Sequence, residues 1–474
     1  MTKDDFIVAI ELGSSKVTAI AGRKRPDGEV LVIAQAQEPA DTFIRKGRIN
    51  NYTKMTSSVE NIKRKLEKAL DRTIKGAYVG IGGMGMHTVS NTVGRRLGEK
   101  QIISEEMVDA VKDANIGMPP ADKEILEVIP QDYKLDTQTT AEPIGMASES
   151  IEGHFLNIVA SASLSKSVSE CFRGANLSVV GMPISTLCLA DSILTEPEKR
   201  SGCVFVDMGA ETTSVAVYKN NILRHFAVIP LGGANINRDI CTLQIEDAEA
   251  EQLKRRYARA YTTPEETPEQ TTITFSDGRS VSYEEFQGLV EARMEEIILN
   301  IKNQIDLSGY DDSKLVGGII VTGGASSIRS IDKAFTGFTT FKKIRFVKNT
   351  RIPVHVDSKS MGGGSMAANF NADGSFNTVI AMVERGEISC DGGPTGSDPD
   401  IFGGEPVKPI SLGGEGTETA GPKTPEKAPE PTKEKPQEEK KKKGGGFKSF
   451  FKKLADKAST LVSEDEDKFP GDEK

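Results

Sequence analysis

Two stretches of the chain share one pattern of apolar and polar positions. In residues 204–217 two valine-rich runs flank a polar turn, and residues 6–21 repeat the arrangement. Short apolar runs of this kind predict the two strands of a buried hairpin. Either stretch alone fits an ordinary hairpin with a polar tip equally well. Two of them, about two hundred residues apart, indicate two related lobes that each offer a turn to one ligand.

The remaining apolar pattern predicts a mixed α/β chain. Strands are expected at residues 77–79, 86–93, 125–130, 157–162 and 318–322. Helices are expected from the N-cap residue Ser104 onward and over residues 165–174, 185–194, 246–261, 283–307 and 376–384. A loop is expected at 262–270. Within 283–307 the apolar residues that recur at helical spacing are expected in the core: Phe286, Leu289, Val290, Met294, Ile297, Ile298, Ile301 and Ile305.

The polar turn in 204–217 contains the residue types of a phosphate site. Gly209 lets backbone amides approach an anion without interference from a Cβ. The hydroxyls of Thr212 and Thr213 can donate to phosphate oxygens. Asp207 can hold Mg²⁺ through the waters that this ion retains. In the other hairpin Glu11 stands where Asp207 stands, and Gly13 where Gly209 stands.

Two further glycine motifs have features of an anion-binding site. Gly232-Gly233 leads into a predicted helix, whose N-terminus is expected to face an anion. Gly80–Gly85 matches the spacing GxGxxG after a strand. A dinucleotide site requires a helix next, but the β-branched stretch 86–93 predicts a strand. We therefore reject a dinucleotide site at Gly80–Gly85.

Composition and charge narrow the class of protein. A chain of 474 residues with 37% hydrophobic and 27% charged residues predicts two or more globular cores. A net charge of −9 argues against nucleic acid as a partner. Scattered cysteines and histidines favour neither disulfides nor a metal cluster. The absence of an apolar signal region or of a membrane-length apolar run predicts a protein kept in the cytoplasm.

The last part of the chain predicts a tether to a membrane. Residues 391–445 are rich in Gly, Pro, Glu and Lys and are expected to be disordered. Residues 446–462 predict an amphipathic helix that lies in the membrane interface. Its expected membrane contacts are the apolar stripe and the neighbouring lysines: Phe447, Phe450, Phe451, Leu454, Leu461, Val462, Lys448, Lys452 and Lys453. The alternative is a helix that docks on the protein's own body or on a partner protein.

The order of these motifs resembles the actin/Hsp70/sugar-kinase ATPase superfamily and, within it, the FtsA family of bacterial cell-division proteins. The most specific stretches are Ile81–Met84, Pro130–Tyr133 and Pro143–Met146, followed by Glu152 and His154. The resemblance covers roughly residues 6–390 and the C-terminal helix. It implies an α/β, actin/Hsp70-like fold of two duplicated lobes with an FtsA-type extra subdomain, a disordered linker and a C-terminal amphipathic helix.

This resemblance also implies a division of the chain into segments. First-lobe core is expected at 1–83, 166–201 (which includes the inter-lobe helix) and 361–390, with the extra subdomain at 84–165. Second-lobe core is expected at 202–232 and 313–360, around a small subdomain at 233–312. The linker at 391–445, the membrane helix at 446–462 and an acidic tail at 463–474 complete the chain.

The family implies a function and a set of ligands. ATP with Mg²⁺ is expected between the lobes, with Glu11 and Asp207 near the metal. The protein is expected to form actin-like filaments and to bind the FtsZ C-terminal tail through residues 233–312. It would thus hold FtsZ filaments at the cytoplasmic face of the inner membrane, on anionic lipid at the division septum, and recruit later divisome proteins. The alternatives are another ATPase of the superfamily or a pilus-type actin-like scaffold.

Individual residues acquire roles from the same resemblance. The first phosphate turn comprises Gly13, Ser14, Ser15 and Lys16, and the second comprises Asp207, Gly209, Thr212 and Thr213. Contacts to the ribose, the phosphates and the adenine are implied for Gly232, Gly233, Asn235, Glu251, Lys254, Gly323, Gly324 and Ala325.

Several residues depart from the superfamily pattern. Glu11 replaces a frequent Asp, Ala210 and Glu211 replace glycines, and Ser214 replaces another Asp. Glu211 adds a negative charge beside a polyphosphate, which is unfavourable unless the side chain points away or helps to hold the metal. Met182 occupies the region of the inter-lobe helix where hydrolysing relatives place a water-orienting Glu or Gln. We therefore expect ATP to be bound but hydrolysed slowly or not at all.

Overall fold

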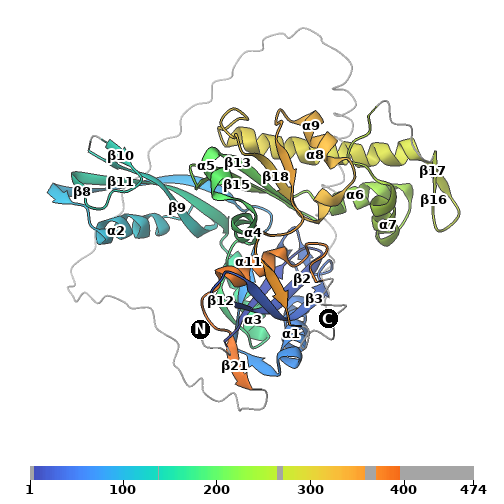
Figure 1. Cartoon of the computed structure of the whole chain (residues 1–474), viewed down its shortest axis with the longest axis horizontal. Coiled ribbons are helices and arrows are strands. Elements are labelled where there is room, and N and C mark those ends of the chain that lie inside the picture. Colours follow the sequence, from blue (N-terminus) through green and yellow to red (C-terminus); the bar gives the residue numbers. More distant parts are fainter. Residues whose placement is uncertain (1–4, 137, 264–270, 358–369, 395–474) are drawn as a thin grey trace, which may run out of the picture. The chain divides into compact units, whose positions relative to one another are not determined.

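The computed structural model describes residues 5–136, 138–263, 271–357 and 370–394 (Figure 1). Its α-helices are α1 Tyr52–Leu70, α2 Glu105–Ile116, α3 Leu164–Gly174, α4 Ser185–Ile193, α5 Glu196–Ser201, α6 Gly233–Ile240, α7 Asp247–Tyr257, α8 Tyr283–Leu307, α9 Ile331–Phe338 and α11 Asn377–Arg385. Short 3₁₀ helices occur at Cys241–Leu243 (η1) and Gly324–Ser327 (η2). None of the described helices is both long and apolar enough to cross a membrane.

The first lobe is built on a six-stranded sheet. Its strands, in spatial order, are β12 Ser178–Gly181, β7 Gly76–Gly80, β1 Ile7–Leu12, β2 Lys16–Lys24, β3 Val30–Pro39 and β20 Val354–Val356. Alternate residues of β1 point to opposite faces, as in any strand. Val8 and Ile10 pack with α1 and α3, whereas Ile7 and Ala9 pack with α11. Because both faces are covered, β1 is apolar along most of its length.

The second sheet has nine strands, which run through the second lobe and the inserted subdomain. Their spatial order is β10 Gln138–Thr140, β9 Lys123–Leu135, β11 Ala147–Ser161, β8 His87–Ile102, β15 Ile222–Ile229, β14 Thr213–Lys219, β13 Cys203–Met208, β18 Gly318–Thr322 and β19 Ile344–Phe346. Strands β8 to β11, with α2, form the inserted subdomain. Strands β13–β15, β18 and β19, with α6–α9, form the second lobe. The two parts meet at one ladder pair, Ala227 with His87.

The remaining strands of the described residues form three two-stranded sheets. They are β4 Ile44–Arg45 with β5 Arg48–Ile49, β16 Thr272–Thr274 with β17 Ser280–Ser282, and β6 Arg72–Ile74 with β21 Asp391–Pro394.

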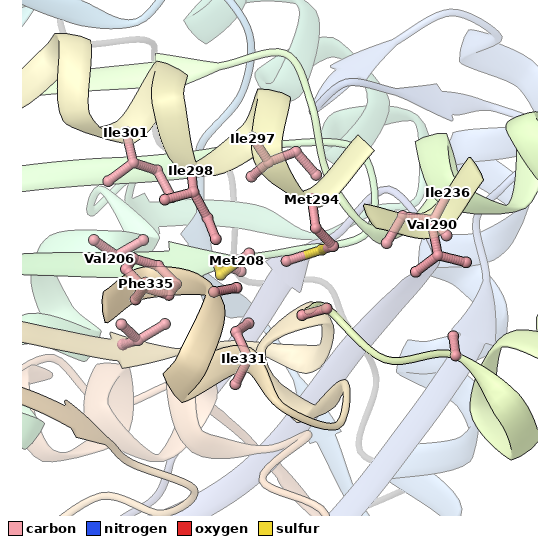
Figure 2. Close-up of a cluster of buried hydrophobic side chains, with 14 of the residues drawn as sticks. Val206, Met208, Ile236, Val290, Met294, Ile297, Ile298, Ile301, Ile331 and Phe335 are labelled. Atoms are coloured by element: carbon pink, nitrogen blue, oxygen red, sulfur yellow. The ribbon is translucent and has the colours of Figure 1, made fainter. Parts of the chain in front are cut away.

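The core of the second lobe lies between β13 and the long helix α8 (Figure 2). Val206 and Met208 of β13 face Met294, Ile298 and the other buried residues of α8. The predicted bounds of α8 and most of its apolar stripe are confirmed. Leu289 is the exception, because it is only half-buried. Gln287 is buried instead, and its amide bonds the backbone N–H and C=O of Arg259 at 3.1 and 2.6 Å.

The inserted subdomain begins where the GxGxxG spacing ends. The chain enters strand β8 at His87, two residues after Gly85, so the prediction of a strand in place of a dinucleotide-binding helix is confirmed. Helix α2 starts after Ser104, whose side chain accepts from the Met107 N–H as predicted. A buried amide pair holds the far end of α2, because Asn115 Nδ2 donates to Asn157 Oδ1 at 2.8 Å.

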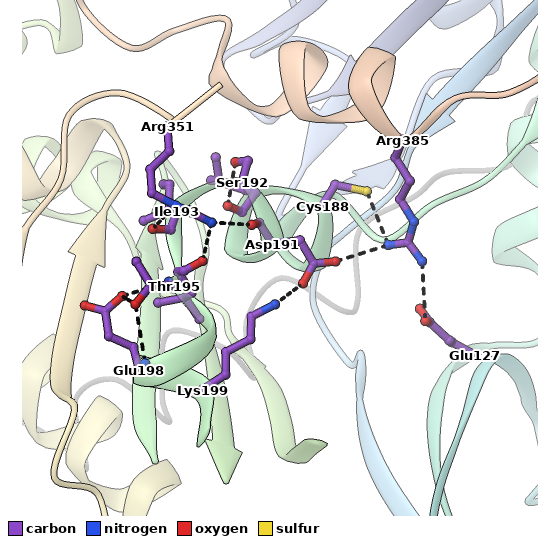
Figure 3. A network of polar contacts seen from close by, with 12 residues as sticks. Glu127, Cys188, Asp191, Ser192, Ile193, Thr195, Glu198, Lys199, Arg351 and Arg385 are labelled. Atoms are coloured by element: carbon purple, nitrogen blue, oxygen red, sulfur yellow. Dashed lines mark hydrogen bonds and ion pairs between the residues drawn. The ribbon is translucent and has the colours of Figure 1, made fainter. Parts of the chain in front are cut away.

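A polar network surrounds the C-terminus of the inter-lobe helix α4 (Figure 3). Arg351 donates to the carbonyl oxygens of Ile193, at 3.1 Å, and Leu194. These carbonyls lie where the helix leaves its last C=O groups unbonded. Arg385 of α11 reaches the α4 residue Asp191 at 3.7 Å and the inserted-subdomain residue Glu127 at 3.9 Å. Both lobes and the inserted subdomain therefore meet around this one helix.

Two predicted boundaries are wrong. The charged helix expected over 246–261 ends at Tyr257, because the next residues become extended and pair with another segment. Arg259 forms a bridge with Arg329, and the Ala260 N–H donates to the Arg329 carbonyl at 2.7 Å. The linker expected from 391 begins later, since Asp391–Pro394 forms β21 against β6. Most of the predicted loop 262–270 and the linker beyond residue 394 lie outside the described residues.

Candidate functional site

Two turns of the same construction lie at the ends of two hairpins. In the first lobe Leu12 pairs with Val17, which leaves the four residues 13–16 as the turn. In the second lobe Met208 pairs with Thr213, which leaves the four residues 209–212. Glu11 and Asp207 occupy the same place in their hairpins, two residues before each turn glycine. The predicted twin hairpins are confirmed.

The backbone of each turn requires glycine at its first position. A Cβ on Gly13 would lie 2.6 Å from the Lys16 carbonyl oxygen, and one on Gly209 would lie 2.9 Å from that of Thr212. In the second turn the Gly209 N–H donates to the same Thr212 carbonyl at 2.8 Å. The close approach of backbone atoms that glycine permits therefore occurs within the turn itself, between residues 209 and 212.

The two twin carboxylates come from different lobes and oppose each other electrostatically. Burial, and secondly the charge of Asp207, raise the pKa of Glu11 to about 7, against the opposing effects of a Thr378 hydrogen bond and of Lys16. Burial raises the pKa of Asp207 to about 6. A half-buried pair of like charges is unfavourable unless a proton or a cation accompanies it.

The third group of the site lies at the start of α6. Gly232 passes so close to the second turn that a Cβ there would lie 2.6 Å from the carbonyl oxygens of Gly209 and Ala210. The first N–H groups of α6 bond these same carbonyls, from Gly233 at 3.0 Å and Ala234 at 2.7 Å. The expectation that this helix N-terminus faces an anion is thus wrong, because its leading amides are already satisfied.

Helix α7 contributes a charged pair beside Gly233. Lys254 Nζ donates to the Gly233 carbonyl at 3.0 Å and pairs with Glu251 at 2.6 Å. Burial by itself raises the pKa of Glu251, but hydrogen bonds from Lys254, Arg255 and Asn237 outweigh it and bring the pKa to about 2. Glu251 is therefore ionised throughout the neutral range.

The glycine pair after β18 completes the second-lobe part of the site. Gly323 has φ +92°, and a Cβ there would overlap the Met208 carbonyl and lie 2.6 Å from Asp207 Oδ1. Ala325 lies within 3.2 Å of the position that a Cβ on Gly233 would take. The structure thus brings together Asp207, Gly233 and Gly323 from three separate stretches. Asn235 belongs to the same group, since its Oδ1 accepts from the Gly232 N–H at 3.0 Å.

Family models match two parts of the chain. The model described as Cell division protein FtsA matches residues 204–369, and that described as SHS2 domain inserted in FTSA matches residues 83–159. The cell division protein FtsA of Porphyromonas gingivalis is 30% identical over 346 residues, which are 71% of this chain and 72% of that protein. This chain belongs to the FtsA family.

A second FtsA and one solved structure extend the comparison. FtsA of Pseudomonas aeruginosa is 29% identical over 331 residues, which are 68% of this chain and 78% of that protein. A structure of the PilM-PilN type IV pilus biogenesis complex is similar with a TM-score of 0.53 at 14% identity, over 80% of this chain and 97% of that chain. The fold is the predicted actin-like α/β fold, and the FtsA family accounts for the inserted subdomain.

Among the turn residues expected from the FtsA family, the two threonines differ. Thr213 is fully buried, and its hydroxyl donates to the Leu231 carbonyl at 2.9 Å. The prediction that Thr213 donates to a phosphate is therefore wrong. Thr212 is half-buried and Ser15 is exposed, and Ser14 Oγ accepts from the Gly47 N–H at 3.0 Å.

Glu211 is the departure from the superfamily pattern with the largest structural consequence. Its side chain is only 4% exposed. Its carboxylate accepts from Lys46 N at 2.6 Å and pairs with Arg45 at 3.1 Å and Arg238 at 2.7 Å. The expected conflict is thus resolved by positive partners. Arg45 and Lys46 escaped sequence analysis because they lie more than 160 residues away and belong to no motif.

Met182 does not lie on the inter-lobe helix. It follows strand β12 and precedes α4, which begins at Ser185. The side chain packs against the apolar core of the first lobe. The nine membrane-contact residues predicted in 447–462 lie outside the described residues.

Proposed function

We propose that this protein is an ATP-binding, filament-forming adaptor that holds FtsZ filaments at the inner membrane during cell division. Membership of the FtsA family supports the role in division. The observation that carries the nucleotide part is the pair of twin turns, whose carboxylates Glu11 and Asp207 come from the two lobes and are both partly buried, with the charge of Asp207 adding to the cost of ionising Glu11. A ligand that brings a cation between these lobes relieves that cost.

The residues present fit ATP with Mg²⁺. A divalent ion held through its waters by Glu11 and Asp207 would offset their repulsion. Lys16 of the first turn supplies a positive charge beside it, which the pKa of Glu11 already registers. When bound, Mg²⁺ neutralises charge on the phosphates. On the second lobe, Lys254 and Glu251, which lie beside Gly233, are proposed to contact the nucleoside.

Hydrolysis is proposed to be slow or absent. The segment Gly181–Leu187 contains no carboxylate or amide side chain, and the partly buried Met182 packs against the first-lobe core. Positioning of the attacking water carries much of the catalysis in phosphoryl transfer. The bound nucleotide then serves to hold the two lobes together. A turnover of several per second in the purified protein would contradict this.

The partners are assigned to separate parts of the chain. Residues 233–312 are proposed to bind the FtsZ C-terminal tail, and the body to bind further copies of itself in an actin-like filament. Residues 446–462 are proposed to anchor the protein, as a peripheral protein, to anionic lipid on the cytoplasmic face of the inner membrane. Later divisome proteins are proposed to be recruited there.

The nucleotide proposal is tested by titrating the full chain with a fluorescent ATP analogue, with and without Mg²⁺. Replacing Asp207→Asn should lower the Mg²⁺-dependent affinity about 10–100-fold, as for residues that hold a metal through its outer shell. The exposed Asp332→Asn is the matched control and should bind as the wild type does. Equal affinity of the Asp207 variant would remove Asp207 from the site.

The adaptor proposal is tested by co-sedimentation with vesicles that contain anionic lipid, followed by addition of FtsZ. The full chain should pellet and carry FtsZ with it, whereas a chain cut after Lys443 should stay in solution. Phe451→Glu should abolish pelleting, and Phe469→Glu, outside the stripe, should not. Pelleting of the full chain without FtsZ would remove the FtsZ-tethering role and leave the fold and the membrane anchor standing.

A further inference from the structure

We propose that Glu211 is a positioning residue that fastens the two lobes through the turn Lys46–Gly47, and that this turn passes the closure of the lobes to the inserted subdomain. The recipient is the segment Gly83–Thr88, here termed the root, from which strand β8 starts. The nucleotide part of this inference rests on the proposed function. The mechanical part rests on contacts alone.

Glu211 joins the lobes as a buried acceptor. Arg45 and Lys46 come from the β4–β5 hairpin of the first lobe, and Arg238 comes from α6 of the second lobe. Removing a carboxylate that is 4% exposed leaves the Lys46 N–H without its partner. A charge-assisted hydrogen bond in a dry place is among the stronger ones.

The turn Lys46–Gly47 touches both phosphate turns at once. Its two consecutive residues have φ of 49° and 75°. The Lys46 N–H donates to Glu211 at 2.6 Å, and the Gly47 N–H donates to Ser14 Oγ at 3.0 Å. These two neighbouring amides are each bonded to a different turn, so their hydrogen bonds fix the separation of the two turns. A change in that separation must break one bond or move the turn.

The root is hydrogen-bonded to the turn Lys46–Gly47 and packs closely against it. The Met84 N–H donates to the Lys46 carbonyl at 2.8 Å. A Cβ on Gly83 would lie 2.8 Å from the carbonyl oxygens of Lys46 and Gly47, and Arg48 Nε donates to the Met84 carbonyl at 3.2 Å. If the turn Lys46–Gly47 moves, the root must move with it or lose these contacts.

The other end of the root is bonded to the second lobe. The Val228 N–H donates to the Met86 carbonyl at 3.0 Å. Thr88 Oγ1 donates to the Phe226 carbonyl at 3.2 Å and accepts from the Phe226 N–H at 3.1 Å. The root is therefore bonded to the first lobe at one end and to the second lobe at the other. Opening of the lobes must release one of the two ends, and the inserted subdomain then gains freedom to swing.

The experiment is hydrogen exchange by mass spectrometry on the full chain, followed in peptides that cover 44–51 and 82–90. Without nucleotide, Glu211→Gln should speed exchange about tenfold in both peptides, and leave α8 unchanged. Arg45→Ala, which removes the cross-lobe pair, should speed both by a smaller factor. Arg238→Ala removes an equal pair inside one lobe and should leave 82–90 unchanged, as should the distant surface variant Arg25→Ala.

Faster exchange confined to 44–51 in Glu211→Gln would overturn the inference, since Glu211 would then act locally. With Mg²⁺ and ATP, the wild type should exchange more slowly in both peptides. Glu211→Gln should release the fluorescent ATP analogue about ten times faster at an unchanged association rate. If the wild type binds no nucleotide, the proposed cleft fails, whereas the nucleotide-free exchange still decides the inference.

Discussion

The two hairpin turns, 13–16 and 209–212, have the same construction but differ in their side chains. Both span four residues, both begin with a glycine that lies against the carbonyl of the fourth residue, and both follow a carboxylate. At the third position the first turn has the exposed Ser15, and the second has the buried Glu211. The third side chain of the first turn is thus exposed to solvent, whereas that of the second turn joins the two lobes.

The twin carboxylates offer the largest expected effect. The folded-state pKa of Glu11, about 7, lies above its ordinary value of 4.5, so its ionisation costs stability as pH rises through this range. Glu11→Gln should stabilise the metal-free and nucleotide-free protein by about 3 kcal/mol at pH 8 and by nothing below pH about 4.5. Urea unfolding in EDTA at both pH values measures this. A gain that is independent of pH would show that the ionisation of Glu11 is not its cause.

The turn glycines should rank by the space that each leaves. Gly13→Ala should destabilise the protein by about 2.5 kcal/mol and Gly209→Ala by about 1.5, within the range for overpacked sites. The reason is that the added Cβ meets a carbonyl oxygen at 2.6 Å in the first turn and at 2.9 Å in the second. Thermal unfolding of both variants beside the wild type measures the order. The reverse order would show that the first turn yields more easily.

The third turn position should distinguish the two copies. Glu211→Gln should cost about 2 kcal/mol of unfolding free energy, because it removes the charge from two ion pairs and weakens the bond to Lys46. Ser15→Ala should cost almost nothing, since Ser15 is exposed. Chemical denaturation at low and high salt is the measurement. Similar costs at both positions would remove the contrast between the turns.

The smallest effect concerns the residue that follows each turn. Thr213→Val gives the second hairpin the residue that the first hairpin has at Val17. It should cost about 1 kcal/mol, the usual value of one hydrogen bond, because the Leu231 carbonyl loses its donor. The affinity for the ATP analogue should not change. An affinity loss without a stability loss would return Thr213 to the phosphate site.

Much of the fold follows from local patterns. Valine-rich runs around a Gly turn suffice for both hairpins, and the helical spacing of α8 gives its bounds. Where a predicted helix bound is wrong, a segment far away in the sequence determines the structure. The helix expected to reach 261 ends at Tyr257 because Arg259 and Ala260 pair with Arg329. Nothing in the local sequence announces that pairing.

The site divides in the same way. The glycines and carboxylates were predictable because each needs only its own hairpin. The engagement of the α6 amides with the second turn was not, because it depends on how a helix docks against a loop more than twenty residues earlier. Glu211 stands out in the sequence as an added negative charge, but only the assembly of the two lobes brings its partner Arg45 close to it.

Strand β21 has a mechanical consequence for anything attached to the end of the chain. It pairs with β6, and the Arg72 side chain binds Asp391 through two nitrogens. Just before it, the Cys390 N–H donates to the Phe6 carbonyl at 2.8 Å and the Cys390 carbonyl accepts from Lys75 at 3.0 Å. A pull on the residues after Pro394 therefore enters the first-lobe sheet beside β1. Tension applied there therefore acts first on the first lobe, which carries only one of the twin turns.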